Sequence, residues 1–390
     1  MSSTDLVLAP DGIFTGLSEA LEPGVVVVRE DRIVHVGAPR PDDLRTAIRL
    51  PRTTLLPGLI DAHTHVSIVP SRGDQLSQMR LPLDVQLATA RSNVLADLLS
   101  GVTTMRVMGQ ELGVDFTVRD EIEAGLTLGP DLVCAGVQLA APGGHGHATT
   151  AVTTDAEIVR VVESNVAHGA RLAKIFTTGG VSSVATSSDD VPFTAAAVRC
   201  AADVAHRHGL KLAAHAHGGE GAAIAIRNGV DTIEHGVLLD EWMIDEAAAR
   251  RVAIVGTFSI VDHPAGIEAG DRQRPDIVGK LQQVRHRMGR TWRRILTCVD
   301  DIAVGTDSLH GCLAFDVVRL AEYGATPARA LRAATRGGAE VCGLSDRGVI
   351  APGRRADLVA VLGNPLTDIR AVGSPVLVVK GGRVLHRLAA

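Results

Sequence analysis

The prediction of the fold starts from the stretch Leu56-Pro57-Gly58-Leu59-Ile60-Asp61-Ala62-His63-Thr64-His65. Its apolar residues predict a buried β-strand over residues 55–65. Two histidines separated by one residue project to the same face of an extended strand, where both imidazoles can bind one metal ion. In an isolated motif of this kind, two ordinary buried histidines at a strand end would be the alternative. The apolar run before His63 favours a metal-binding strand.

Beyond this strand, short apolar runs alternate with alanine-rich amphipathic stretches, which is the pattern of β/α units around a parallel sheet. We expect helices such as 195–208 and 327–342 on the outside. Eight strands predict an α/β fold of the (β/α)8 TIM-barrel type, and a doubly wound open sheet is the alternative. The predicted strands are 55–65, 102–108, 131–138, 171–177, 211–216, 232–236, 252–259 and 302–307.

Both ends of the chain have a different texture, with β-branched runs around tight turns. Residues 24–37 predict a hairpin, and residues 356–363 and 375–387 predict three further strands, two of them joined through Gly381-Gly382. We therefore predict a small β-sandwich domain built from residues 1–56 and 350–390, and a barrel of residues 57–349.

Ionisable residues interrupt the apolar pattern at one end of the predicted strands. Barrel enzymes carry their active sites at the carboxyl ends of the strands, so a shared site is expected there. An ordinary core histidine or a helix N-cap would explain any one of these residues alone, but not their common placement. They are His63 and His65 in the first strand, Lys174 in the fourth, His215 in the fifth, His235 in the sixth and Asp307 in the eighth.

Lys174 is one of only four lysines, against 39 lysines and arginines together. Strand alternation places Leu172, Lys174 and Phe176 on one face, where a bare ammonium would be costly to bury. Its side chain either extends to the rim of the barrel or loses its proton and adds carbon dioxide. The second reaction gives a carbamate, an anionic ligand that can bridge two metal ions.

Composition excludes several classes of function. The 390 residues are 46% hydrophobic and 21% charged, with a net charge of -5, which is ordinary for a globular protein. No uncharged apolar run predicts a membrane span, and no basic cluster predicts nucleic-acid binding. Five widely spaced cysteines without a CxxC pair argue against disulfides and a cysteine zinc site. With no secretory signal at the N-terminus, we expect a cytoplasmic enzyme with a small-molecule substrate.

The ordered set HxH, Lys, His, His and Asp resembles the amidohydrolase superfamily. It looks closest to the imidazolonepropionase-like branch, which includes Xaa-Pro (prolidase-like) dipeptidases. The likeness covers nearly the whole chain, through a tail at Pro352-Gly353-Arg354-Arg355-Ala356-Asp357. Related proteins often assemble, so a homo-oligomer is expected.

The resemblance implies a role for each residue. His63, His65 and Asp307 would hold one divalent ion and His215 and His235 the other, with zinc the expected metal. N-carboxylated Lys174 and a hydroxide would bridge the two ions, and the hydroxide would attack an amide carbonyl. Asp307 would act as general base and then as general acid. The predicted substrate contacts are His145, His217 and His310.

We therefore predict a binuclear amidohydrolase that cleaves the C–N bond of a dipeptide or an N-acyl amino acid. Opening of a cyclic amide of the lactam or imidazolone type, or a non-hydrolytic step in a biosynthetic pathway, is the alternative within enzymes. A structural homologue without activity is a further alternative, although such a protein would be expected to have lost ligands that this chain keeps.

Overall fold

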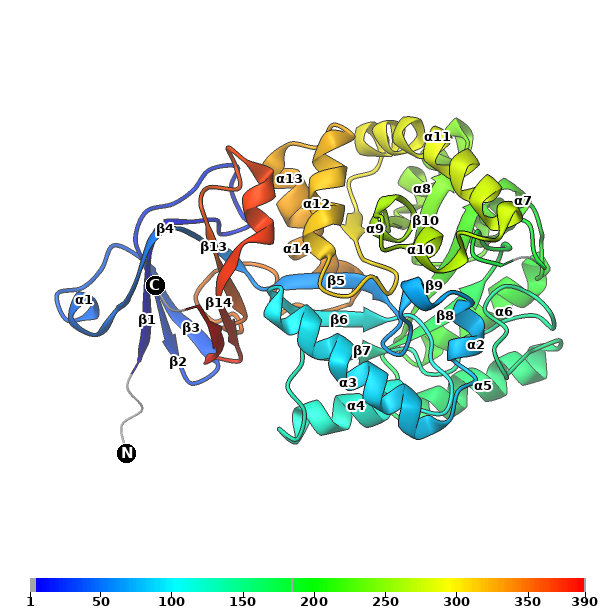
Figure 1. The fold of residues 1–390 in the computed structure, drawn as a ribbon, viewed down its shortest axis with the longest axis horizontal. Helices are drawn as coiled ribbons and strands as arrows, with labels where there is room; N and C mark the ends of the chain where they lie inside the picture. The colour runs from blue at the N-terminus through cyan, green and yellow to red at the C-terminus, as the bar shows by residue number, and fades with distance from the viewer. Residues whose placement is uncertain (1–4, 184, 389–390) are drawn as a thin grey trace.

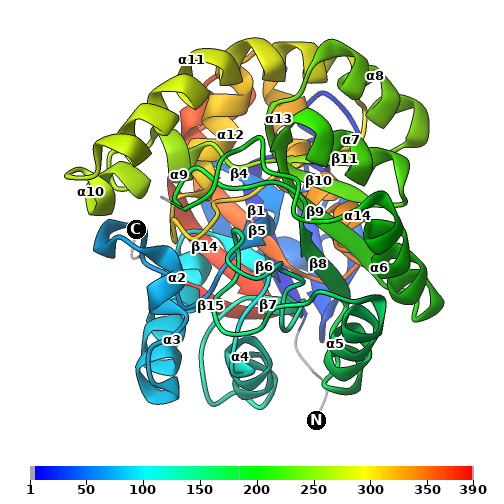
Figure 2. The same ribbon diagram turned by 90° about the vertical axis from the view of Figure 1, so that its right-hand side faces the viewer.

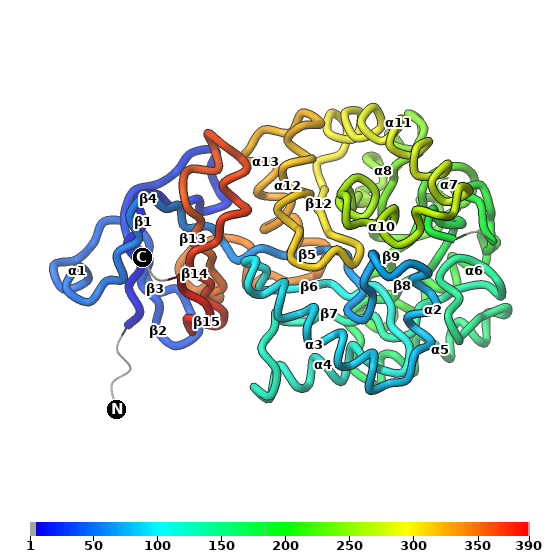
Figure 3. The backbone as a smooth tube through the Cα atoms, viewed as in Figure 1, coloured from blue at the N-terminus to red at the C-terminus, as the bar shows by residue number. Residues whose placement is uncertain are grey.

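The computed structural model describes residues 5–183 and 185–388. Its strands gather in two regions, a β-rich region built from both ends of the chain and a larger α/β region (Figure 1). The smoothed backbone follows the chain out of the β-rich region, once around the α/β region and back again (Figure 3).

The α/β region contains eight strands in two parallel sheets. The first sheet has the order β12-β11-β10-β9-β8 and the second has the order β5-β6-β7, with every neighbouring pair parallel. This confirms the predicted α/β class. The strands are β5 (Leu59–Thr64), β6 (Val102–Val107), β7 (Asp131–Cys134), β8 (Leu172–Phe176), β9 (Lys211–Gly218), β10 (Thr232–Leu238), β11 (Ala253–Gly256) and β12 (Ile302–Val304).

Backbone hydrogen bonds also join the two sheets at their edges. On one side, the Leu139 N–H donates to the Lys174 carbonyl at 2.8 Å, and the Phe176 N–H donates to the Leu139 carbonyl at 3.0 Å. On the other side, the Asp307 N–H donates to the His63 carbonyl at 2.8 Å. These bonds bring the ends of β5, β8 and β12 toward a common centre.

Helices follow the strands and surround them (Figure 2). Predicted helix 195–208 is confirmed, and the Thr194 side chain caps it by accepting from the Ala197 N–H. No helix in the described ranges is long and apolar enough to cross a membrane. The larger helices are α3 (Leu83–Leu99), α4 (Val114–Glu123), α5 (Asp155–Ala167), α6 (Ala195–Arg207), α7 (Gly219–Arg227), α8 (Glu241–Arg250), α11 (Pro275–Cys298) and α12 (Leu313–Glu322).

The single helix predicted over 327–342 is wrong. The structure has two helices there, α13 (Pro327–Ala333) and α14 (Arg336–Val341). Gly337 and Gly338 let α14 pack against the strands. An added Cβ on Gly337 would lie 2.3 Å from the Ile302 carbonyl oxygen, and one on Gly338 would lie 2.8 Å from Ile60 Cβ. The break falls at Ala334 and Thr335, and Thr335 has a non-helical backbone with φ -133° and ψ -91°.

The β-rich region is one seven-stranded sheet with the order β15-β14-β13-β4-β1-β2-β3. Both predicted hairpins are confirmed, as the antiparallel pairs β2–β3 and β14–β15. The two-sheet sandwich and the domain bounds stay predictions. The strands are β1 (Leu6–Ile13), β2 (Val25–Arg29), β3 (Arg32–Gly37), β4 (Ile48–Pro57), β13 (Leu358–Leu362), β14 (Pro375–Lys380) and β15 (Arg383–Arg387).

The predicted strand 55–65 is in fact two strands that meet at Gly58. Strand β4 ends at Pro57 in the seven-stranded sheet, and β5 begins at Leu59 among the parallel strands. An added Cβ on Gly58 would lie 2.2 Å from Thr103 Oγ1 and 2.7 Å from Thr103 Cγ2. Glycine is therefore needed where the chain passes from one sheet to the other.

We predict that Gly58→Ala lowers the free energy of unfolding by about 1–3 kcal/mol, the usual range for overpacking a buried site. Thr103→Ala removes the two nearest colliding atoms and leaves Thr103 Cβ at 2.9 Å, so the penalty of Gly58→Ala should shrink in that background without disappearing. Denaturant titration of the four proteins of this double-mutant cycle measures the coupling. Equal penalties in both backgrounds would contradict the collision at Gly58.

Candidate metal centre

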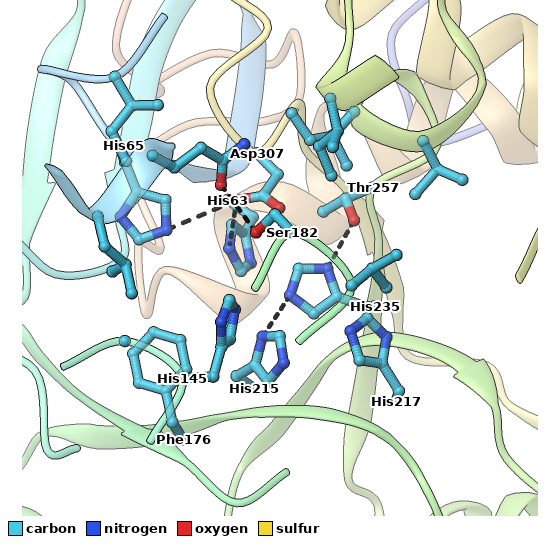
Figure 4. A pocket seen from close by; sticks show the side chains of 18 of the residues that line it. His63, His65, His145, Phe176, Ser182, His215, His217, His235, Thr257 and Asp307 are labelled. Atoms are coloured by element: carbon cyan, nitrogen blue, oxygen red, sulfur yellow. Dashed lines mark hydrogen bonds and ion pairs between the residues drawn. The ribbon is translucent and has the colours of Figure 1, made fainter. Parts of the chain in front are cut away.

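One pocket at the carboxyl ends of the parallel strands brings most of the predicted site residues together (Figure 4). All six predicted metal ligands line it, and so do two of the three predicted substrate contacts. These eight residues are His63, His65, His145, Lys174, His215, His217, His235 and Asp307.

His63, His65 and Asp307 form the first group of candidate ligands, with donor atoms within 4.8 Å of one another. The two Nε2 atoms lie 3.3 Å and 3.5 Å from Asp307 Oδ1. His63 Nδ1 donates to Glu234 Oε2 at 2.7 Å, and His65 Nδ1 donates to the Gly109 carbonyl at 3.0 Å. Both partners are hydrogen-bond acceptors, so each Nδ1 carries the ring proton. The lone pair of each Nε2 is then directed at the shared site.

His215 and His235 form the second group, with His215 Nδ1 2.9 Å from His235 Nε2. The other nitrogen of each ring is held by protein, His215 Nε2 by the Gly179 carbonyl at 3.3 Å and His235 Nδ1 by Thr257 Oγ1 at 2.7 Å. Burial lowers the pKa of both histidines well below the usual value, and neighbouring histidines lower it further. Both rings are therefore neutral, which is the form that binds metals.

Lys174 lies beside both groups and is 1% exposed. Its Nζ has no hydrogen-bond partner among the described residues and lies 4.9 Å from the centroid of the Phe176 ring. Burial lowers the pKa of Lys174 to about 8, although the Glu234 and Asp307 carboxylates act in the opposite direction. A buried amine without a partner is unfavourable, so this position fits a lysine that is converted into an anionic ligand.

Asp307 reaches the site through an unusual backbone. Its φ is +48°, and that of His235 is +73°, a region that non-glycine residues rarely adopt and that is found at functional sites. Burial raises the pKa of the Asp307 carboxyl, but His63, His235 and His65 outweigh it and hold this pKa well below the usual value. The carboxylate is therefore ionised when it faces the histidines.

Gly305 allows this approach of β12 to β5. An added Cβ there would lie 2.4 Å from the His63 backbone nitrogen and 2.8 Å from Asp61 Oδ1. The Asp61 side chain in turn accepts from the Thr306 N–H at 3.1 Å and from Thr306 Oγ1 at 2.6 Å. Asp61 thus fastens the end of the eighth parallel strand to the first.

The sequence interpretation missed the charged groups behind the candidate ligands. Glu234 and Arg106 are fully buried, with Arg106 Nη1 donating to Glu234 Oε1 at 3.1 Å. Burial raises the pKa of Glu234, but Arg106 and then His63 lower it to about 2. The sequence does show one charged residue inside each of these two apolar strands. It does not show that the two residues form a pair, because they are far apart along the chain.

Two predicted substrate contacts have free ring nitrogens in the pocket. Both nitrogens of His217 and Nδ1 of His145 are buried without a partner in the described chain. Burial lowers the pKa of His217 to about 4 and that of His145 to about 3. Both are neutral rings that can hydrogen-bond a substrate.

His310 is placed elsewhere and does not line this pocket. Its Nδ1 lies 2.6 Å from Asp97 Oδ2 of α3, while the Gly311 N–H donates to the other oxygen of the same carboxylate at 2.7 Å. The structure therefore gives His310 an anchoring position on the loop after β12, apart from the other predicted contacts.

A profile of the amidohydrolase family matches residues 54–385. The chain belongs to the amidohydrolase family. This confirms the predicted superfamily and an enzyme that acts on C–N bonds. The match includes every candidate ligand of the pocket.

Individual relatives of this amidohydrolase are distant, and two of the three described here cover nearly the whole chain. Ochratoxinase of Aspergillus niger is 24% identical over 417 residues, covering 95% of this chain and 85% of the relative. Imidazolonepropionase of Stenotrophomonas maltophilia is 25% identical over 281 residues, covering 62% of this chain and 63% of the relative. A crystal structure of a Xaa-Pro dipeptidase with bound methionine in the active site is 27% identical, with a TM-score of 0.89 and coverage of 98% and 100%.

For this amidohydrolase we predict that Glu234→Gln weakens binding of a divalent metal by about 10–100-fold, the usual effect of losing the carboxylate behind a ligating histidine. It also leaves the buried Arg106 without a counter-charge. Competition with a chromophoric chelator measures the affinity. Glu340→Gln, at an exposed i,i+4 pair with Arg336, is the matched control, and equal affinities of the two variants would refute the role of Glu234.

Proposed function

We propose that this protein is a binuclear metal-dependent amidohydrolase that cleaves the C–N bond of a dipeptide or an N-acyl amino acid. The observation that carries the proposal is the arrangement of two groups of neutral imidazole donors around Lys174 and Asp307 in one pocket. We also propose that the eight parallel strands form a closed barrel, since backbone bonds join the two sheets on both sides.

The donor set fits two divalent ions, with His63, His65 and Asp307 for one and His215 and His235 for the other. Imidazole and carboxylate ligands suit zinc. When bound, such a pair supplies a Lewis acid for the amide carbonyl and lowers the pKa of water.

Lys174 would supply the ligand between the two groups. Its neutral amine attacks carbon dioxide, an N–C bond forms, and one proton is released to solvent. A pKa of about 8 leaves part of this side chain as the reactive amine at neutral pH. The resulting carbamate is anionic, and its oxygens can bind metal ions. The buried Lys174 side chain could not do this as an ammonium.

Asp307 would carry the proton during hydrolysis. As water adds to the carbonyl carbon, its proton passes to the Asp307 carboxylate, and the same proton then moves to the leaving nitrogen as the C–N bond breaks. The low pKa of Asp307 keeps the carboxyl group in the deprotonated form that a general base requires. His145 and His217, with free ring nitrogens in the pocket, would orient the carbonyl or a substrate carboxylate.

The comparisons support a dipeptide or acyl amino acid as substrate. The similar Xaa-Pro dipeptidase structure holds methionine in its active site, and another, a prolidase in complex with N-methylphosphonate-L-proline, is 28% identical with a TM-score of 0.88. Opening of a cyclic amide is the second candidate, favoured by the similarity to imidazolonepropionase.

The proposal is tested by incubating the metal-reconstituted protein with dipeptides, N-acyl amino acids and lactams, and identifying the products by mass. Hydrolysis adds the mass of one water, distributed over an amine and a carboxylate. Turnover restricted to lactams would favour the second candidate. No added water with any member would contradict both.

Asp307→Asn should lower kcat by about 10²–10⁴-fold, the usual contribution of a general acid–base group. The amide keeps the shape of the side chain but cannot shuttle a proton, so KM should change less than kcat. Steady-state kinetics with the best substrate measure both constants. Asp301→Asn is the control, because Asp301 directly precedes β12 and lies at its opposite, exposed end. Equal kcat values for the two variants would contradict the proton transfer.

Lys174→Ala should lose paired metal binding and turnover, with partial recovery in short carboxylic acids that replace the carbamate. Metal content is measured by elemental analysis, and the wild-type carbamate by ¹³C NMR after exposure to labelled carbon dioxide. Lys211→Ala at the start of β9, where the side chain donates to the Glu340 carbonyl, is the control. Two bound ions and full activity in Lys174→Ala would overturn the bridging role.

A further inference from the structure

The pocket has an apolar part that the hydrolytic mechanism does not use. Two segments beyond the strand ends supply it, residues 68–79 after β5 and residues 260–271 after β11. We call these two segments the roof. Their apolar pocket-lining side chains are Ile68, Leu76, Met79, Ile260, Val261 and Ile267, and the one uncharged polar side chain that they add to the lining is Gln75.

The two segments of the roof touch through glycines. The first contains the 3-10 turn η1 (Pro70–Arg72) and α2 (Gln75–Gln78), and the second contains α9 (Ser259–Asp262) and α10 (Ile267–Asp271). Helix α10 packs on η1, and Figure 2 shows α10 next to the segment that carries α2. An added Cβ on Gly270 would lie 2.2 Å from the Gly73 nitrogen and 2.4 Å from the Pro70 carbonyl oxygen. Any larger residue at position 270 must move the two segments apart.

Each segment is also held by side-chain hydrogen bonds, the first by its own Gln78 and the second by Arg285 of α11. Gln78 donates to the Gly73 carbonyl at 2.8 Å and accepts from the Val69 N–H at 2.9 Å. Arg285 of α11 donates to the Val261 carbonyl at 2.9 Å and pairs with Glu268 at 2.6 Å. The roof is therefore a built surface whose shape is set before a ligand enters.

Outside the candidate metal centre, the pocket lining offers no counter-charge to an ionised substituent beneath the roof. Among the described residues that line it there is no arginine, Lys174 is the one lysine and Asp307 the one acid. Both of these belong to the candidate metal centre. A charged substituent beneath the roof would lose its hydration without gaining a counter-charge, which is strongly unfavourable.

We infer that the substrate is an amide with a bulky, uncharged apolar substituent that packs beneath the roof, and that the Gly73–Gly270 contact sets the height of the roof. This inference rests on the proposed amide hydrolysis. It narrows the substrate class from amides of amino acids in general to those whose acyl or amine part carries an extended aliphatic or aromatic group.

The first test uses two series of substrates, N-acyl glycines from acetyl to octanoyl and N-acetyl amino acids from alanine to norleucine. In one of the two series, kcat/KM should rise by roughly fourfold per buried methylene until the space beneath the roof is filled. A terminal carboxylate or ammonium on the longest member should remove this gain. If kcat/KM does not change with chain length in either series, the inference is wrong.

The second test changes the roof itself. Gly270→Ala should reduce the ratio of kcat/KM between the longest and shortest members of the preferred series by about tenfold, because the segments separate. Gly279→Ala is the matched control, since an added Cβ on this α11 glycine meets nothing within 4 Å, and its ratio should stay at the wild-type value. Ile267→Ala provides a second roof variant that needs no backbone shift and should lower the same ratio. A wild-type ratio in Gly270→Ala and Ile267→Ala would refute the role of the roof.

These experiments distinguish an error in the proposed hydrolysis from an error in the inferred substrate class. If no amide in either series gains water, the proposed hydrolysis is wrong. If short and long amides are hydrolysed equally well, the hydrolysis stands and the apolar substrate class is wrong. Inhibition by the longer uncharged alkyl amides, measured with any hydrolysed substrate, adds a readout of binding, and inhibition that does not strengthen with chain length would contradict the roof as their site.

Discussion

The candidate metal centre depends on the hydrogen bond between His63 and Glu234, with Arg106 behind it. The three residues come from β5, β10 and β6, so one buried chain of contacts joins three strands from both parallel sheets. Away from water an unpaired member of such a set would cost about 3–5 kcal/mol. The network therefore fixes the His63 tautomer and, through it, the direction of the first ligand.

Small residues lie beside this network inside the strands. Residues from strands of both sheets pack into one buried cluster, including Ala62, Ala213, Ala253 and Ala303. Each lies on a different strand, so the cluster joins strands of both sheets. The Ala62 carbonyl accepts from Arg106 Nη1 at 3.4 Å, so the cluster lies against the network.

Local patterns predicted much of this arrangement, and contacts between distant segments account for what they missed. Strand runs and the spacing of His63 and His65 were visible in the sequence, as were both hairpins. The break at Gly58 was not, because it depends on Thr103, which is far along the chain. Likewise the positive φ of Asp307 is imposed by its surroundings. His310 has the residue type of a substrate contact, but its place on Asp97 is set by a helix that no local pattern connects to it.

Three aromatic side chains pack behind the aliphatic roof, in a chain in which only 2% of the residues are aromatic. Phe258 packs edge-on against Trp292 at 4.9 Å and Tyr323 at 5.2 Å between ring centroids, directly before α9. The buried Asp316 carboxylate accepts from the Phe258 and Ser259 N–H groups at 2.6 Å and 2.9 Å. These three aromatic side chains thus support the start of α9 from behind, while Ile260 and Val261 face the pocket. A ligand then meets an aliphatic surface that is held in place before binding, which lowers the entropic cost of binding.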